Sequence, residues 1–257
     1  MKDNSWLKTF SIGFVIVSFG ITLAIVGFLL TNSKNQSTQK SVSRATDDLP
    51  PLLLKSIGVN LDYYDPKTNK AGDFVFTKER LEFDSLFMNY GFVIPASSAG
   101  GDKSNPQPTF IVPLGTPARS LVDGIVIAIP TLWSGDYSIQ VTANGKMEKW
   151  IYETEHVRNP KVKVGDKVQA GQIIAEVGNF GNNAPAGFGV VEIGILKGGN
   201  TPYHVCPFLY LDPSIKEDIY AKLRAFYRAW NNYKGKTIYN ESSYSVPGCL
   251  TLNPIEG

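Results

Sequence analysis

A glycine-punctuated pattern occurs twice in the middle of the chain. The first copy covers residues 114–128 and the second covers residues 164–177. In each copy an apolar residue and a glycine open a turn, a second glycine follows, and β-branched residues then continue as a strand. We therefore predict two related β-hairpins within a mainly β fold. Positive φ in tight turns is the expected role of the glycines, which are Gly115, Gly124, Gly165 and Gly171.

Three stretches around this duplication carry a resemblance to a known family. They are Gly115-Thr-Pro with the later Val122-Asp-Gly, the run from Tyr152 to His156 that leads to residues 162–168, and Ala170-Gly-Gln-Ile-Ile. Through them, residues 105–212 resemble the lysostaphin/LytM-type zinc endopeptidases. The resemblance implies a LytM-like β-sandwich, or barrel-sandwich hybrid, built on a duplicated hybrid motif. It also implies an association with peptidoglycan.

The residues that hold zinc in that family are absent at the matching positions. The family places a His and an Asp ahead of the Gly-Thr-Pro turn, where this chain has Asn105 and Thr109. Its His-x-His pair lies just before an apolar-Glu-apolar stretch, which places the pair at Phe188 and Val190, ahead of Glu192. A catalytic zinc needs three N, O or S donors and an open position for water. We therefore predict a degenerate member, a pseudoenzyme without catalytic residues, metal ligands or a cofactor.

A rearranged zinc site is the alternative. It would recruit Glu192 together with the chain's 2 histidines, His156 and His204. No CxxC or HxxxH spacing supports such a site, and the family pattern uses four histidines. Zinc is expected only under this alternative, in which the protein is an active peptidoglycan metalloendopeptidase. Whether the chain is an enzyme stays open at this point, with the supply of ligands favouring a non-enzyme.

The resemblance also implies a groove, which is the candidate binding site. Its candidate residues are Thr109, Tyr152, His156 and Glu192. His156 matches the histidine that in active relatives lies beside the zinc-bound water, although a lone His near a strand end is more commonly a hydrogen-bonded surface residue. On a regular strand, Glu153 and Glu155 would share one face, while Tyr152 and His156 would point to the other face.

The N-terminal region has the composition of a membrane anchor. Residues 10–30 contain no charged side chain and are long enough to cross a bilayer core, so we predict a transmembrane helix. A cleaved signal peptide is the runner-up, and the flanking lysines do not set an orientation. Residues 31–48 are polar and predict a flexible tether. The family's usual habitat then implies a single-pass membrane protein with an extracytoplasmic C-terminal domain.

The remaining segments predict smaller elements around the β-domain. Alternating apolar residues over 57–63 and 74–76 indicate a hairpin, residues 78–89 fit a short helix, and residues 97–108 form a loop. An apolar stripe over 213–234 predicts an amphipathic helix. The expected organisation is a tail over 1–9, the transmembrane helix over 10–30, the tether over 31–48, the accessory hairpin and helix over 49–104, the LytM-like domain over 105–212, and the C-terminal helix and tail over 213–257.

Cys206 and Cys249 are the 2 cysteines of the chain. A disulfide between them would tie the C-terminal tail to the domain, and two buried free thiols are the other interpretation. The net charge of +2 is spread along the chain and excludes nucleic-acid binding, which needs a basic patch.

Three functional hypotheses result. The first is a non-catalytic, membrane-anchored LytM-like domain that binds or scaffolds cell-envelope components or wall hydrolases. The second is the active metalloendopeptidase with a rearranged zinc site. The third is a membrane-fusion adaptor, which also has an anchor and a hybrid motif but normally inserts a long helical hairpin between the two half-motifs.

Overall fold

A computed structural model describes residues 49–96 and 101–256. The predicted tail, transmembrane helix and tether lie outside these residues. Within the described part of the chain, no helix combines the length and the hydrophobicity needed to cross a membrane.

The accessory segment precedes the domain in the sequence, and the C-terminal segment follows it. The accessory segment contains β1 Lys70–Ala71, β2 Phe74–Val75, the 3-10 helix η2 Glu82–Asp84, β3 Phe87–Met88, β4 Val93–Ile94 and β5 Lys103–Ser104. The C-terminal segment contains α2 Pro213–Lys234, η5 Glu241–Ser243 and β15 Ile255–Glu256. The domain contains β6 Thr109–Pro113, β7 Pro117–Arg119, β8 Gly124–Ala128, β9 Tyr137–Thr142, β10 Trp150–Arg158, β11 Lys167–Val168, β12 Ile173–Val177, η3 Phe180–Asn182, β13 Phe188–Lys197, β14 Tyr203–Val205 and η4 Pro207–Tyr210.

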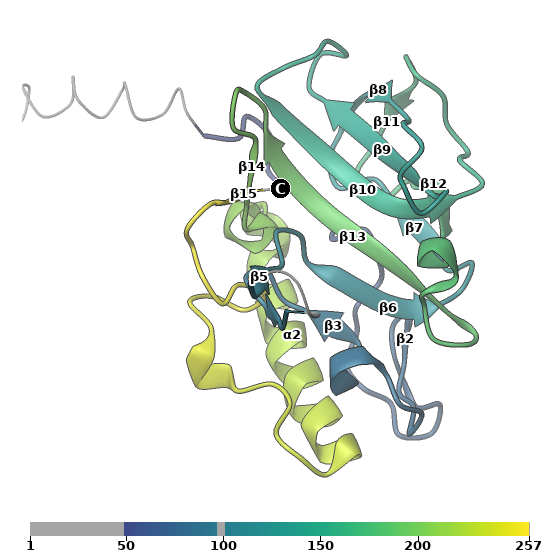
Figure 1. The fold of residues 1–257 in the computed structure, drawn as a ribbon, viewed down its shortest axis with the longest axis vertical. Helices are drawn as coiled ribbons and strands as arrows, with labels where there is room; N and C mark the ends of the chain where they lie inside the picture. The colour runs from purple at the N-terminus through teal and green to yellow at the C-terminus, as the bar shows by residue number, and fades with distance from the viewer. Residues whose placement is uncertain (1–48, 97–100, 257) are drawn as a thin grey trace, which may run out of the picture. The chain divides into compact units, whose positions relative to one another are not determined.

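The fold is mainly β, as the sequence predicts, and its centre is the antiparallel pair β10 and β13 (Figure 1). One path of the 11-stranded sheet runs β11-β8-β9-β10-β13-β14-β15. β13 also pairs with β6, on the edge opposite β10, and β6 in turn pairs with β3. β12 pairs with β7 and with the end of β10. The two long strands β10 and β13 therefore link the strands of both copies into one sheet with β6, β14 and β15.

The two copies do not form the predicted hairpins. β7 of the first copy pairs with β12 of the second, and β8 of the first pairs with β11 of the second. The two connecting turns bond to each other as well: the Ser120 N–H donates to the Gln172 carbonyl at 2.9 Å, and the Gly171 N–H donates to the Ser120 carbonyl at 2.8 Å. The two copies thus exchange strands: each strand of the first copy pairs with a strand of the second copy. A local pattern cannot reveal such long-range pairing.

Two of the glycines show the different roles that turn glycines have in this exchange. Gly171 has a φ of 80°, as the turn prediction requires. Gly124 has no positive φ and is required instead by close approach, because a Cβ atom there would lie 2.6 Å from the carbonyl oxygen of Thr142. The prediction of positive φ is therefore wrong for Gly124.

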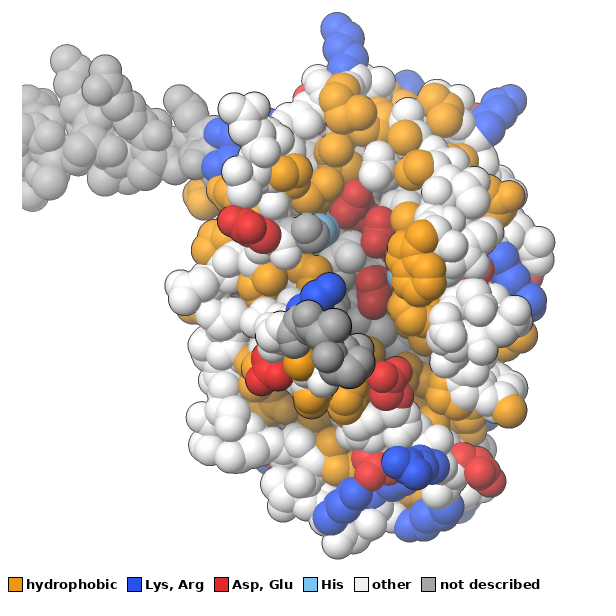
Figure 2. All heavy atoms as spheres, viewed as in Figure 1, with side chains coloured by type: hydrophobic (Ala, Val, Ile, Leu, Met, Phe, Trp, Pro, Cys, Tyr) orange, Lys and Arg blue, Asp and Glu red, His pale blue; other side chains and the backbone are white. Residues whose placement is uncertain are grey.

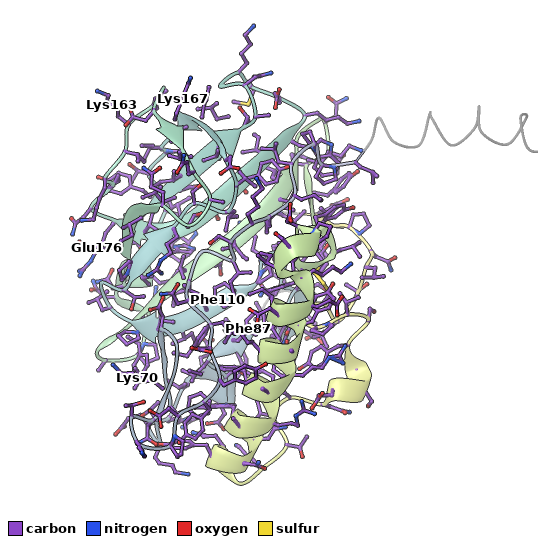
Figure 3. The ribbon with its side chains drawn as sticks, turned by 180° about the vertical axis from the view of Figure 1, so that it is seen from behind. Lys70, Phe87, Phe110, Lys163, Lys167 and Glu176 are labelled. Atoms are coloured by element: carbon purple, nitrogen blue, oxygen red, sulfur yellow. A yellow bond between two sulfur atoms is a disulfide. The ribbon has the colours of Figure 1, made fainter. Side chains whose placement is uncertain are left out.

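The predicted C-terminal helix is confirmed as α2. It begins after Asp212, whose carboxylate accepts the Ser214 N–H at 2.9 Å, and ends at Gly235, which has a φ of 71°. Figure 3 shows α2 crossing the back of the sheet beside the labelled Phe87 and Phe110. The ring of Phe87 stacks on that of Tyr227 at 6.2 Å between centroids. The apolar stripe of the helix is therefore packed against the β-domain.

The accessory segment differs from its prediction. No helix spans residues 78–89, because Phe83 has a left-handed φ of 53° inside the single 3-10 turn η2, and Phe87 then pairs with Phe110 of β6. The predicted hairpin is reduced to β1 and β2. Residues 57–63 form no strand; Ile57, Val59 and Leu61 are buried, whereas Tyr63 is exposed. Pairing with the central sheet therefore outweighs the weak helical pattern.

Cys206 and Cys249 form a disulfide, with their Cα atoms 6.1 Å apart. This resolves the two interpretations left by the sequence. The tail is also held by β15, which pairs with β14, and by a backbone bridge between Tyr90 and Cys249. The segments 49–104 and 213–257 therefore share one core with the domain, within a compact unit over Pro50–Gly257.

Candidate functional site

Acidic side chains gather in a hollow over the central strands (Figure 2). Strand register explains the grouping. Glu192 of β13 lies opposite Thr109 of β6 on one side and opposite Glu155 of β10 on the other. Because residues directly opposite each other in an antiparallel pair point to the same face, these three side chains form one row across the hollow. The row contains two carboxyl groups on neighbouring strands.

Thr109 and Asn105 occupy the positions where the family has its first two zinc ligands. The Thr109 hydroxyl donates a hydrogen bond to Glu192 Oε1 at 3.0 Å, and Asn105 Nδ2 donates to Thr109 Oγ1 at 3.2 Å. Both side chains are buried. The two positions therefore form a hydrogen-bonded chain that ends on the Glu192 carboxylate.

His156 joins this row through an irregularity in β10. The pairing of β10 with β9 shifts register between Thr154 and Val157, and His156 has a left-handed φ of 56°. Its Nε2 atom consequently lies 3.7 Å from Glu192 Oε2. The prediction that His156 points away from the face of Glu155 is wrong, because the bulge turns the imidazole onto that face.

The other side of the imidazole contacts a loop. Nδ1 lies 3.2 Å from Ser134 Oγ and 3.7 Å from Asp136 Oδ2. The His156 ring also packs edge-on against Phe180, with centroids 4.3 Å apart. These contacts leave the imidazole side chain only 5% exposed.

Burial dominates the protonation of the groove. It lowers the pKa of His156 to about 4, so the imidazole is neutral near pH 7. Burial raises the pKa of Glu192 to about 7. Burial and the charge of Glu153 raise the pKa of Glu155, and burial also raises that of Asp136. Ionised carboxylates are therefore disfavoured here unless a cation or a hydrogen-bond donor approaches them.

Tyr152 lies apart from the other three predicted groove residues. It is 1% exposed and belongs to the hydrophobic core on the opposite face of β10. Its hydroxyl accepts the Leu52 N–H at 2.7 Å and donates to the Leu52 carbonyl at 2.8 Å. The structure thus brings Thr109, His156 and Glu192 together and leaves Tyr152 as an anchor for the accessory segment.

A second polar cluster continues along the same face. His204 Nε2 lies 3.1 Å from Glu153 Oε2, and Gln140 donates to Glu153 Oε1 at 2.9 Å. Gly194 makes room for it, since a Cβ atom there would lie 3.1 Å from the His204 ring and 2.7 Å from Gln107 Nε2. The predicted sharing of a face by Glu153 and Glu155 is confirmed by their register against β13.

An aromatic wall beside His156 was not foreseen from the sequence. Trp133 is 78% exposed, and its ring lies 5.3 Å from that of Phe180 and 6.4 Å from that of His156. The only sequence signal is a Trp within a Pro- and Gly-containing turn. An exposed indole next to buried polar groups is typical of a binding surface.

The residues present do not match the family's zinc site. At the positions that the family resemblance assigns to the first His, the Asp and the His-x-His pair, Asn105, Thr109, Phe188 and Val190 provide an amide, a hydroxyl and two apolar side chains. A different set of donors lies beside them, in which one ligand atom each from Glu155, His156 and Glu192 falls within 4.8 Å of the others. Only this second set has the donor chemistry for a metal ion.

Part of the chain matches a known protein family. Residues 108–200 match the model of peptidase family M23. The resemblance to LytM/lysostaphin-type peptidases is thereby confirmed for this part of the chain. A search of curated proteins found no match.

Several solved structures are similar to the chain. A LytU structure is 28% identical over 51% of this chain and 81% of that chain, with a TM-score of 0.37. The catalytic domain of lysostaphin from Staphylococcus simulans is 24% identical over 44% and 79%, with a TM-score of 0.35. Csd3 from Helicobacter pylori is 16% identical over 80% and 53%, with a TM-score of 0.36.

Proposed function

We propose that the M23-type domain binds a cell-envelope component, with peptidoglycan as the first candidate, and does not cleave it by the zinc mechanism of the family. The observation that carries this proposal is the chemistry of the three ligand positions. The Thr109 hydroxyl and the Asn105 amide are engaged with each other and with Glu192, and Val190 is apolar. Proteins hold zinc with Cys, His, Asp or Glu side chains, and none of Asn105, Thr109 and Val190 is of those types.

The shape and lining of the groove support a binding role. Its floor carries the carboxyl groups of Glu155 and Glu192, and one wall presents the exposed ring of Trp133. Such a combination suits a peptide or glycopeptide, because an aromatic ring packs against apolar or sugar faces while carboxylates accept N–H donors. A wall hydrolase docked over the same hollow is the second partner that we propose.

The disulfide supports an extracytoplasmic location. Disulfides persist in oxidising compartments and are rare in the cytosol. With the predicted transmembrane helix over residues 10–30, we propose that the domain is tethered outside the cytoplasmic membrane. Labelling of an introduced exposed cysteine, Tyr63→Cys, in intact cells with a membrane-impermeant reagent tests this orientation, and protection of that cysteine until the cells are lysed would contradict it.

Binding is tested by cosedimentation of the full-length protein with purified peptidoglycan. Trp133→Ala is the informative variant, because the ring is exposed and its removal should leave the fold intact. Loss of an aromatic anchor of about 2 kcal/mol should weaken binding roughly 30-fold. Tyr63→Ala is the matched control, since Tyr63 is also an exposed aromatic residue, at 55% exposure, and belongs to the accessory segment. Equal binding by both variants and the wild type would contradict the proposed groove.

One observation favours a second candidate function. The donor set of Glu155, His156 and Glu192, with Glu155 in place of the predicted His204, is a basis for a rearranged zinc endopeptidase. Zinc-dependent release of amino groups from peptidoglycan, abolished by Glu192→Gln, would establish that activity. The adaptor hypothesis has no such support, because residues 129–161 contain strands β9 and β10 in place of a long helical hairpin.

A further inference from the structure

We infer that Glu155, His156 and Glu192 bind one divalent transition-metal ion at a place displaced from the zinc position of the M23 family. The three residues come from two adjacent strands, β10 and β13. None of them occupies a family ligand position, which here are Asn105, Thr109 and Val190. The inference goes beyond the proposed function and does not depend on it, since a domain that binds peptidoglycan needs no metal.

Strand register supplies the first argument for a cation. Glu155 and Glu192 lie directly opposite each other in the pairing of β10 with β13. Two carboxylates at such a position repel each other whenever both are ionised. A divalent cation between them removes the repulsion and uses both carboxylates as ligands. The bulge at His156 adds the imidazole to the same face, so that consecutive residues 155 and 156 both face Glu192.

The distances supply the second argument. His156 Nε2 and Glu192 Oε2 are 3.7 Å apart, which is too long for a hydrogen bond. Two ligands of one tetrahedral ion with bonds of about 2.1 Å lie about 3.4 Å apart, so this separation suits a shared metal. All three donor atoms fall within 4.8 Å of one another.

The environment behind the imidazole supplies the third argument. Asp136 Oδ2 lies 3.7 Å from His156 Nδ1, has no hydrogen-bond partner among the described residues, and belongs to a side chain that is only 8% exposed. Ser134 Oγ is 3.2 Å from the same nitrogen. A carboxylate behind the second nitrogen of a histidine is the usual arrangement at metal sites, where it fixes the tautomer and directs the other nitrogen to the ion. At 3.7 Å the Asp136 oxygen is not hydrogen-bonded to Nδ1, whose partner within hydrogen-bond distance is the Ser134 hydroxyl, but a buried carboxylate beside the second nitrogen has the chemistry and the place of such an outer partner.

The donor types restrict the metal. One imidazole nitrogen and two carboxylates suit Zn²⁺, Co²⁺ or Mn²⁺ better than Ca²⁺ or Mg²⁺, which prefer oxygen ligands alone. Three protein ligands leave a coordination position open toward the hollow. A carboxylate or carbonyl of a bound envelope peptide has the chemistry to fill that position.

The experiment is a titration of the full-length protein, purified with detergent and freed of metal, with Co²⁺ and Zn²⁺. We expect one equivalent to bind, with a visible Co²⁺ spectrum that Zn²⁺ displaces. His156→Asn and Glu192→Gln should abolish it, and Asn is chosen because it tolerates the left-handed backbone at this position. Asp136→Asn should weaken binding by about 10- to 100-fold.

Two control variants separate this site from its neighbours. Val190→Ala alters a family ligand position, and His204→Gln removes the other histidine, so both should bind metal as the wild type does. Circular dichroism of each variant verifies the fold. Absence of binding by the wild type would overturn the inference, and so would binding that survives both His156→Asn and Glu192→Gln.

A measurement on the wild type keeps the inference testable if those variants do not fold. The chain has 2 histidines, so ¹⁵N spectra of the imidazoles contain two sets of signals, which His204→Gln assigns. Zn²⁺ should shift the Nε2 signal of His156 and leave that of His204 in place. A shift confined to His204, or to neither histidine, would contradict the site.

Discussion

Reduction of the disulfide between Cys206 and Cys249 should destabilise the protein mainly through its unfolded state. The two cysteines are separated by 43 residues. On the chain-entropy model, closing a loop of this length stabilises the folded state by about 4 kcal/mol. In the folded state the tail has other attachments, since the Gly248 N–H donates to the Tyr227 hydroxyl at 3.1 Å and β15 pairs with β14. We therefore expect the reduced tail to stay in place.

The assay is urea unfolding of the full-length protein, oxidised and reduced, followed by the fluorescence of its 4 tryptophans. The free energy of unfolding should fall by about 4 kcal/mol on reduction, and the slope against urea should rise because the reduced unfolded chain exposes more surface. Cys206→Ala with Cys249→Ala should reproduce the loss. A difference below about 1 kcal/mol, or proteolytic release of the tail under native reducing conditions, would refute the reasoning, because the crosslink would then act on the folded state or not at all.

Three further predictions concern the core, the packing of β8 against β9, and the helix. Burial raises the pKa values of Tyr227 and Tyr239 above the ordinary value near 10, so the stability that they contribute is complete below about pH 10 and is lost as the pH rises further. The absorbance of tyrosinate should therefore rise together with the loss of circular dichroism. Tyrosine ionisation while the circular dichroism spectrum stays native would contradict this prediction. Gly124→Ala places a Cβ atom 2.6 Å from the Thr142 carbonyl oxygen and should lower the free energy of unfolding, measured by calorimetry, by about 1–3 kcal/mol. An unchanged midpoint of thermal unfolding would contradict the tight packing of β8 against β9. Asp212→Ala removes the cap of α2 and should lower the free energy of unfolding by about 1 kcal/mol, and no change in urea would contradict the capping role.

The parts of the fold that sequence analysis predicts are those with local signals. The helix over Pro213–Lys234 follows from apolar spacing alone, and the structure adds the Asp212 cap and the terminal Gly235. The exchange of strands between the two copies does not follow, because pairing partners lie far apart in the chain and each copy alone has the pattern of a hairpin. The expected helix over 78–89 fails for the same reason, since pairing of Phe87 with Phe110 outweighs the local preference.

Sequence analysis predicted most of the residues of the candidate site, but not how they are arranged in space. Thr109 and Glu192 follow from the family resemblance, and strand register places them opposite each other. Tyr152 was misplaced because regular alternation and burial direct it into the core. His156 reaches the groove only through a bulge, which breaks the period of two on which face assignments depend. Asp136 joins the site through a loop, and no sequence spacing indicates that contact.

The most direct test of the central claim is whether the full-length protein cleaves the peptidoglycan that it binds. Purified peptidoglycan is incubated with the protein and added Zn²⁺, and both the bound protein and the newly released amino groups are measured. We predict that the protein sediments with peptidoglycan and releases no amino groups, because none of Asn105, Thr109 and Val190 is a Cys, His, Asp or Glu, the residue types that hold zinc. Release of amino groups that stops on addition of a chelator would contradict the account.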